Sequence, residues 1–450
     1  MNTNAIIAIG VVAVLVVAGG AAAILMTKDD GSKSDEKTMD CKLRVMGNAE
    51  QDNYLDKKDV EFIQDIIDGK KVWDRNKDRL ADANNDGVID TADVELVNKF
   101  LAGTSATMYY LDWDNGVRSV QYPLTEVLGT SYLISTEFTT GIDIAIILGI
   151  DSKVKYVANT DMATSKLDTT IYPNVGDAKS FFFKTPDLET MYADGVRILM
   201  GDHPAGFANY SETAAAEKFT CIKLPLNRSV NGTTSLDTLI TLGVMFNLQD
   251  KTAPFIKFMD KVNDKIESAV SSAGVKSKSY VIPYMAPGYE TFYIDAHSSG
   301  KYTMADVIML ERLPVISKVT TKAADGFDEM SVEAVAALNP DIFVVSMFAY
   351  AEDKDLTAND YKNDFKSVVA KGLDKTEAGK NNMLFAIPFE TCTLAGYASL
   401  LVLASMIWPD AFDANEGWDL MQEYYDTFTN FKGDVKTSKF APLAYADLKA

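Results

Sequence analysis

Short runs of almost uninterrupted apolar residues constrain the fold of this chain more than any other feature. Four such runs are ILMGD (198–202), SYVIPY (279–284), DIFVVSMF (341–348) and NMLFAIPF (382–389). A strand that is buried on both faces carries a run of this kind, because neither face alternates with solvent. Helical segments separate the runs, so we predict α/β units with parallel sheets.

A long amphipathic helix is predicted at APFIKFMDKVNDKIESAVSSAG (253–274), between these runs. Its apolar residues recur at helical spacing, and Gly274 ends the segment. These apolar positions are Phe255, Phe258, Met259, Val262 and Ile266.

A similar phrase lies on each side of this helix: PDLETMYADGVRILMGD (186–202) and MSVEAVAALNPDIFVVS (330–346). Each has an early glutamate (Glu189 and Glu333), a helical turn, a polar corner and then a buried strand. Two ordinary αβ units would explain the phrases equally well. Their placement around one long helix favours two α/β lobes.

With these features the chain resembles the substrate-binding proteins of ABC importers for ferric siderophores, haem and corrinoids. The hallmark is a helix followed by AALNPDIFVVS (336–346), with support from YPLTEVL (122–128), GYASL (396–400) and WPDAF (408–412). The resemblance covers about residues 108–435. It implies two α/β lobes joined by one rigid helix, with the solute held between them.

The same resemblance implies a partner, the ABC permease that receives the solute. In this family an exposed glutamate on each lobe docks on the permease, and the matching positions are Glu189 and Glu333. Carboxylates are also favoured at helix N-termini on physical grounds, so both should stay ionised and exposed. Helix capping alone is the alternative role.

For the solute we expect an iron chelate, haem or a corrinoid. Large ligands of this kind need apolar and aromatic walls with a few polar groups, and open α/β sheets place ligands on the loops after their strands. His203 would be the axial ligand of a haem or corrinoid, or else a helix-capping loop residue. Arg312 would pair with an anionic ligand, or else form a surface ion pair. The full set of predicted ligand-binding residues is His203, Phe207, Tyr284, Met285, Tyr289, Arg312, Met347, Phe348, Tyr350, Phe389 and Glu390.

A calcium-type loop lies far upstream, beginning DANNDGVID (82–90). Gly87 stands at position 6, where such a loop needs a sharp turn, and Val88 at position 7 offers its carbonyl. Side-chain oxygens fall at positions 1, 3, 5, 9 and 12, which are Asp82, Asn84, Asp86, Asp90 and Asp93. We call residues 82–93 loop 2. An acidic surface turn is the alternative.

The pattern also occurs 34 residues upstream, in residues 48–59, which we call loop 1. Asn53 takes the turn position, because asparagine tolerates a left-handed backbone, and Tyr54 offers the carbonyl. The oxygen ligands would be Asn48, Glu50, Asp52, Asp56 and Asp59. Similar helices follow the two loops: DVEFIQDIIDG (59–69) and DVELVNKFLAG (93–103).

This duplicated loop and helix, over about residues 43–104, resembles a type I dockerin. The resemblance implies two Ca²⁺ sites and a cohesin-like partner. That partner would contact the late loop residues, Lys57-Lys58 and Thr91-Ala92, which differ and so disfavour two-fold symmetric binding. A purely intramolecular structural module is the alternative.

Residues 5–26, AIIAIGVVAVLVVAGGAAAILM, are apolar throughout. A helix of this length rises about 33 Å, enough to cross a membrane core of about 30 Å. A cleaved signal peptide is the alternative, but no Lys or Arg precedes Lys28. We expect a single N-terminal span in the cell membrane with the bulk of the chain extracellular, as sequons at Asn209, Asn227 and Asn231 also suggest.

The expected domains follow from these features. Residues 1–27 form the anchor, 28–42 a polar tether, 43–104 an all-α dockerin-like module, 108–249 the N-terminal lobe, 250–274 the linking helix and 275–450 the C-terminal lobe.

Composition excludes several classes of function. The net charge of −21 argues against a nucleic-acid partner, which needs a basic face. Three scattered cysteines provide no disulfide framework, and two histidines are too few for most zinc sites. Nucleophile elbows, HExxH, Walker A and GxGxxG motifs are absent from the sequence, so we expect no enzyme. A cell-surface scaffold or adhesion protein assembled through the dockerin-like module is the alternative function.

Overall fold

The computed structural model describes residues 42–449 with several gaps. The gaps, together with the N-terminal segment and the last residue, lie outside the described part: 1–41, 125–132, 136–139, 158–167, 176–178, 181–187, 201–217, 227, 231–232, 286–290, 296–300, 304–311, 320–326, 348–354, 389–393 and 450.

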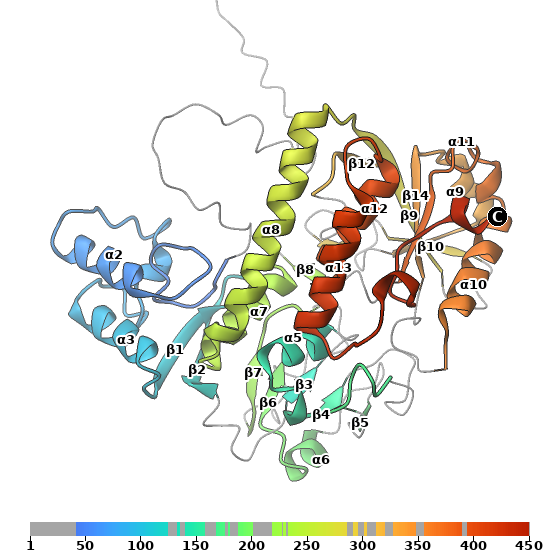
Figure 1. The fold of residues 1–450 in the computed structure, drawn as a ribbon. Coiled ribbons are helices and arrows are strands. Elements are labelled where there is room, and N and C mark those ends of the chain that lie inside the picture. The colour runs from blue at the N-terminus through green and yellow to red at the C-terminus, as the bar shows by residue number, and fades with distance from the viewer. Residues whose placement is uncertain are drawn as a thin grey trace, which may run out of the picture.

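The duplicated segment forms a small helical unit, which we call the paired-loop module (residues 42–104). It contains α2 (Lys57–Ile67), the 3₁₀ turn η1 (Arg79–Ala81) and α3 (Thr91–Leu101). A capping box starts each α-helix, with Asp56 and Asp59 at α2 and Asp90 and Asp93 at α3. An antiparallel hairpin, β1 (Ala106–Leu111) and β2 (Val117–Tyr122), follows the module and lies beside it (Figure 1).

The first lobe is built on a five-stranded sheet in the order β5-β4-β3-β6-β7. All of its strand pairs are parallel. The strands are β3 (Leu133–Ser135), β4 (Val154–Val157), β5 (Lys179–Ser180), β6 (Ile198–Met200) and β7 (Thr220–Ile222). Its helices are α5 (Thr140–Leu148), η3 (Asp151–Lys153), α6 (Leu188–Ala193) and α7 (Ser235–Met245).

The second lobe contains a seven-stranded mixed sheet in the order β13-β10-β9-β14-β15-β16, with β12 also paired to β9. Its strands are β9 (Lys278–Met285), β10 (Phe292–Asp295), β12 (Val315–Ser317), β13 (Phe327–Met330), β14 (Ile342–Met347), β15 (Leu384–Pro388) and β16 (Leu443–Ala444). The α-helices are α9 (Val332–Ala337), α10 (Ala358–Ala370), α11 (Glu377–Lys380), α12 (Leu394–Ile407) and α13 (Ala414–Phe428). Three 3₁₀ turns complete it: η8 (Leu373–Lys375), η10 (Val435–Thr437) and η11 (Tyr445–Leu448).

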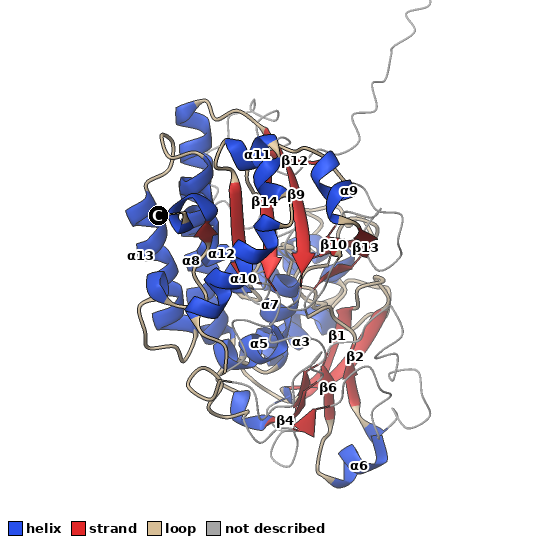
Figure 2. Cartoon of the chain, turned by 90° about the vertical axis from the view of Figure 1, so that its right-hand side faces the viewer, coloured by secondary structure: helices blue, strands red, loops and turns tan. Residues whose placement is uncertain are grey.

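Helices cover both faces of this second sheet, with α12 on one side and α9 and α10 on the other (Figures 1 and 2). In β14 the side chains of Ile342 and Val344 enter one buried cluster, whereas those of Phe343 and Val345 enter another. This two-sided burial explains the continuous apolar run of β14. All four predicted strands are present, as β6, β9, β14 and β15.

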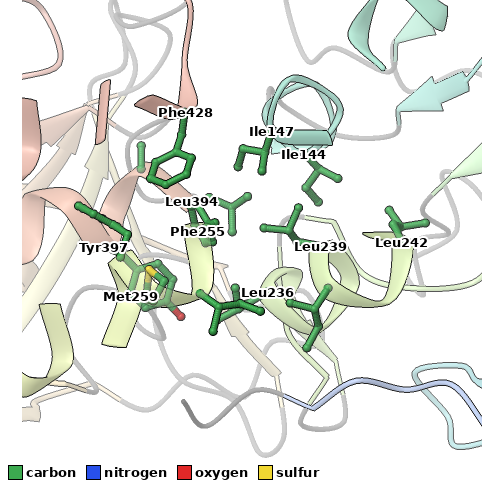
Figure 3. Packing of buried hydrophobic residues seen from close by; sticks show 14 of the residues in the cluster. Ile144, Ile147, Leu236, Leu239, Leu242, Phe255, Met259, Leu394, Tyr397 and Phe428 are labelled. Atoms are coloured by element: carbon green, nitrogen blue, oxygen red, sulfur yellow. The ribbon is translucent and has the colours of Figure 1, made fainter. Parts of the chain in front are cut away.

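The helix α8 (Gln249–Ala273) runs along one side of both lobes (Figure 1) and confirms the helix expected at 253–274. It ends at Gly274, whose backbone is left-handed (φ +58°), as a C-cap glycine allows. The apolar stripe of α8 packs against α5 and α7 of the first lobe and α12 and α13 of the second. Figure 3 shows Phe255 and Met259 of α8 among the side chains of these four helices.

A small sheet also joins segments of the two lobes. The strand β8 (Arg228–Val230), which precedes α7, pairs antiparallel with β11 (Lys301–Thr303), which follows β10. The lobes are therefore connected both through α8 and through this two-stranded pairing.

Within the described residues, no helix is both long enough and apolar enough to cross a membrane. The anchor expected at residues 5–26 lies outside them, and so do residues 28–41 of the polar tether and the asparagines of the three sequons.

Candidate functional site

Three parallel strands of the second sheet, β9, β14 and β15, finish side by side at the same end of the sheet. In the register of the sheet, Met347 at the end of β14 is opposite Met285 of β9 and Pro388 of β15. The segments that follow these strands contain five of the eleven predicted ligand-binding residues. The structure thus places the starts of these three segments side by side.

The loop residues themselves lie outside the described part of the chain. They are His203 and Phe207 after β6, Tyr289 after β9, Phe348 and Tyr350 after β14, and Phe389 and Glu390 after β15. Tyr284 and Met285 belong to β9, but their side chains are likewise not described.

Two of the predicted ligand-binding residues expose no side chain at this end of the sheet. The side chain of Met347 is 1% exposed and belongs to the core between the sheet and α10, so it does not line a surface. Arg312 precedes β12, which pairs in parallel with the first residues of β9, beginning at Lys278. The eight-residue strand β9 spans about 25 Å, so Arg312 and Met347 lie at opposite ends of the strands of this sheet.

The two glutamates predicted to dock on a permease occupy equivalent positions. Glu189 lies in the first turn of α6 and Glu333 in the first turn of α9, and both are exposed. Each helix leads into an inner strand of its sheet, β6 or β14. Glu189 forms an ion pair with Lys218 (Oε1 to Nζ, 2.7 Å), a surface contact that contributes little stability. The backbone N–H of Glu333 and the Ser331 hydroxyl lower the pKa of the Glu333 carboxyl.

The two calcium-type loops share one hydrogen-bond pattern. Asp59 at position 12 of loop 1 and Asp93 at position 12 of loop 2 are buried, and each carboxylate accepts two backbone N–H bonds. The donors are Glu50 and Asp56 in loop 1 and Asn84 and Asp90 in loop 2, at 2.8–3.1 Å. The carboxylates at positions 5 and 9 also accept equivalent bonds: Asp52 from Tyr54, Asp86 from Val88, Asp56 from Lys58 and Asp90 from Ala92. The duplication read from the sequence is therefore present in the backbone.

The turns of the two loops differ from the prediction at one position. Gly87 has the left-handed backbone expected at position 6 (φ +89°), but Asn53, its counterpart, is not among the residues with positive φ. Instead Gln51 and Asn85, at position 4 of each loop, are both left-handed (φ 59° and 57°). The prediction of a left-handed backbone at Asn53 was wrong, because the chain of loop 1 reverses without a left-handed residue at position 6.

Loop 1 has an unsatisfied oxygen at its first position. Asn48 is fully buried, and its Nδ2 group donates to the carbonyls of Leu43 (2.9 Å) and Asp52 (3.0 Å). Its Oδ1 atom accepts no hydrogen bond from the described residues. A buried acceptor without a partner costs about 1–3 kcal/mol, which an oxygen-binding cation would offset. Burial, and secondarily the nearby Asp52, raise the pKa of Asp59 to about 7.

The donor chemistry of both loops therefore fits a hard cation such as Ca²⁺. In the described part of the chain, however, no three Asp, Glu, His or Cys side chains are grouped to hold a metal ion. Backbone N–H groups engage the loop carboxylates instead.

The paired-loop module is continuous with the first lobe. Its buried residues Leu43, Val45, Val97 and Phe100 belong to the same hydrophobic cluster as α5, α7 and α8. The module therefore packs as part of the first lobe, which agrees with the intramolecular alternative for the dockerin-like segment.

Arg44 and Asp237 hold this junction together, and the sequence analysis did not identify either of them. The Arg44 guanidinium is buried and donates to the carbonyls of Leu111 (3.0 Å) and Asp112 (2.7 Å) in the hairpin turn. The Asp237 carboxylate, in the first turn of α7, accepts from the backbone N–H groups of Lys42 and Thr234. The spacing Thr234-x-x-Asp237 is a capping-box signal that could have located this helix start.

Comparison with known proteins gives no match by sequence: no protein-family model matches the chain, and no curated protein does. Solved structures do match its fold. The TroA-like periplasmic binding protein FepB of Veillonella parvula has a TM-score of 0.55 at 14% identity, covering 75% of this chain and 99% of that one. Helicobacter pylori CeuE, in a nickel-histidine complex, has a TM-score of 0.52 at 14% identity, covering 74% and 98%. An ABC transporter solute-binding protein of Sulfurospirillum deleyianum has a TM-score of 0.51 at 13% identity, covering 73% and 98%. At these identities the likeness concerns the fold, which is the α/β fold of TroA-like periplasmic binding proteins.

The junction predicts a pH-dependent stability. Burial raises the pKa of Asp237 to about 6, above its value of about 3.9 in an unfolded chain. The contribution of Asp237 to the free energy of unfolding is therefore complete below about pH 4 and is lost as the pH rises through about 6. Relative to Asp237→Asn, the wild type should lose up to about 3 kcal/mol of unfolding free energy between about pH 4 and 7. Chemical denaturation across this range measures the difference, and parallel profiles for the two proteins would contradict it.

Proposed function

We propose that the chain is a solute-binding receptor that captures an iron chelate, haem or a corrinoid between its lobes and delivers it to an ABC importer. The observation that carries the proposal is the fold shared with periplasmic binding proteins, in which α8 contacts helices of both lobes. FepB and the Sulfurospirillum protein are named as binding proteins, and CeuE is described in a nickel-histidine complex. These descriptions support a binding role without catalysis.

The placement of the strand ends supports the same proposal. Strands β9, β14 and β15 end side by side, and aromatic residues follow each of them in the sequence. Apolar and aromatic walls suit a large chelate or a macrocycle. His203, in the loop after β6, is the residue we propose as an axial ligand.

We further propose that residues 5–26 anchor the receptor in the cell membrane, with both lobes and the paired-loop module outside. The length of the apolar run and the polar segment after it support this arrangement. The alternative is a scaffold or adhesion protein that binds a cohesin-like partner. Its proposed contact residues, Lys57-Lys58 and Thr91-Ala92, are exposed in the module.

A ligand panel tests the receptor role. We expect one class among ferric siderophores, haemin and cyanocobalamin to raise the melting temperature of the full chain. A ligand at one hundred times its Kd stabilises the folded state by about 2.7 kcal/mol. Metal-free siderophores and metal-free porphyrin serve as matched controls. Binding of a cohesin module without any response to the panel would favour the scaffold alternative.

The docking role of the two glutamates is tested by charge reversal. The double variant Glu189→Lys/Glu333→Lys should abolish solute uptake through the permease while leaving solute affinity and folding unchanged. Both side chains are exposed, and neither contributes to a buried cluster. The control is Glu61→Lys/Glu95→Lys, which makes the same change of charge at exposed positions on α2 and α3. Uptake that survives the first reversal, or solute affinity that falls with it, would refute the docking role.

We propose Ca²⁺ as the cofactor of both loops. Loop 1 would hold it through Asn48, Glu50, Asp52, Asp56, Asp59 and the Tyr54 carbonyl, and loop 2 through Asp82, Asn84, Asp86, Asp90, Asp93 and the Val88 carbonyl. The cation would offset the burial and the carboxylate repulsion that raise the pKa of Asp52, Asp59 and Asp93.

Calorimetric titration of the full chain should show two Ca²⁺ binding events, the tighter one in loop 2. Loop 2 has the glycine turn and an acidic first residue, Asp82, where loop 1 has Asn48. Asp82→Asn should weaken the tighter event toward the affinity of loop 1, whereas Asp74→Asn, outside both loops, should leave both unchanged. The absence of heat in the wild type would rule out the cofactor.

A further inference from the structure

The first residue of α8 is bonded to loop 1. The side-chain amide of Gln249 faces the backbone of Leu55, which lies at position 8 of that loop. The Leu55 N–H donates to Gln249 Oε1 (2.9 Å), and Gln249 Nε2 donates to the Leu55 carbonyl (3.1 Å). One amide thus pairs with both polar groups of one loop residue, as the peptide group of a neighbouring strand would.

The helix that follows loop 2 reaches the same place. The Tyr122 hydroxyl lies 2.6 Å from the Phe100 carbonyl near the end of α3 and 3.0 Å from Oδ1 of Asn247, two residues before α8. A Cβ atom on Gly103 would lie 2.8 Å from Nδ2 of Asn247, so the glycine after α3 makes room for that side chain. Both halves of the paired-loop module therefore contact the N-terminal end of the linking helix α8, the first half directly and the second half through Tyr122.

This contact region is partly buried, since Gln249 is half-buried and Asn247 is exposed. Leu55, Phe100 and Tyr122 are 3%, 2% and 1% exposed, and the rings of Phe100 and Tyr122 meet edge to face with centroids 5.2 Å apart. Burial raises the pKa of Tyr122 to about 12, so its hydroxyl stays a proton donor at neutral pH. The bonds between Gln249 and Leu55 are partly shielded from water, which strengthens them relative to exposed ones, so a change on one side is transmitted to the other.

We propose that the paired-loop module is an effector site for the linking helix: a divalent cation of the calcium class in loop 1 and the geometry of the first turn of α8 are energetically coupled through Gln249. Cation binding fixes the backbone of loop 1, and with it the Leu55 groups that Gln249 pairs with. The coupling is reciprocal, so the contact from α8 in turn strengthens cation binding. Because α8 packs on both lobes, the module acts on the element that joins them.

The test compares three full-length variants with the wild type by calorimetric titration with CaCl₂. Gln249→Ala removes both bonds and should weaken the loop 1 event about tenfold, whereas Gln249→Glu keeps only the acceptor and should weaken it about threefold. The matched control is Gln422→Ala. Gln422 on α13 makes the same kind of contact, accepting from the Val435 N–H (3.0 Å) and donating to the Gly433 carbonyl (3.0 Å), but in the second lobe. It should change Ca²⁺ affinity less than about twofold.

Hydrogen exchange gives a second measurement, which needs no solute and is therefore independent of the receptor role. In the wild type, CaCl₂ relative to EGTA should slow amide exchange at residues 251–253 and 255, in the first turns of α8. In Gln249→Ala this protection should disappear, and in Gln422→Ala it should remain. The proposal is overturned if Ca²⁺ does not bind, if Gln422→Ala weakens binding as much as Gln249→Ala, or if exchange in the wild type is the same with and without Ca²⁺.

Discussion

The burial of one apolar stripe on α8 is the interaction on which the rest of this structure depends. Phe255 stands 5.2 Å, ring to ring, from Phe428 of α13 and belongs to the same cluster as Ile144 of α5 and Leu239 of α7. Those contacts come from both lobes, so neither lobe buries its helices without the linking helix. The fully buried helix α12 and the paired-loop module join the same cluster. One continuous core thus holds together segments that the sequence presents as separate units.

The regular parts of this arrangement could be predicted because their cause is local. In β14, adjacent residues enter opposite cores, so the strand must be apolar throughout, and α8 shows its stripe at helical spacing. The antiparallel strands β10, β13 and β16 escaped prediction because short strands such as FDEM carry no continuous apolar run. Arg312 was misplaced because its position depends on the register between β12 and β9, which local sequence does not encode. Arg44 was missed because a buried arginine and a surface arginine look alike until their partners are known.

The paired-loop module shows that a repeat in the sequence can be present in the backbone while its packing partners differ from those that the resemblance implies. The 34-residue repeat is real in the backbone, where the carboxylates of Asp59 and Asp93 accept the same pair of bonds. A dockerin serves as an attachment module, whereas this one shares a core with its neighbour. Spacing identifies the loop, since twelve residues suffice to define it. What the loop packs against depends on residues about 190 positions away, such as Gln249 and Asp237.

The pairing of β8 with β11 has a mechanical consequence. Two bodies joined by one helix keep a rotational degree of freedom about its axis, so one could swivel past the other. A backbone ladder that lies outside the helix, here from Arg228–Val230 to Lys301–Thr303, resists that torsion. A further tie acts in the same sense, since the Asn430 side chain beyond α13 donates to the Ile171 carbonyl in the first lobe (3.1 Å). With these connections, the relative movement left to the two lobes is a small rocking. It changes the distance between the lobes without rotating one against the other about the axis of α8.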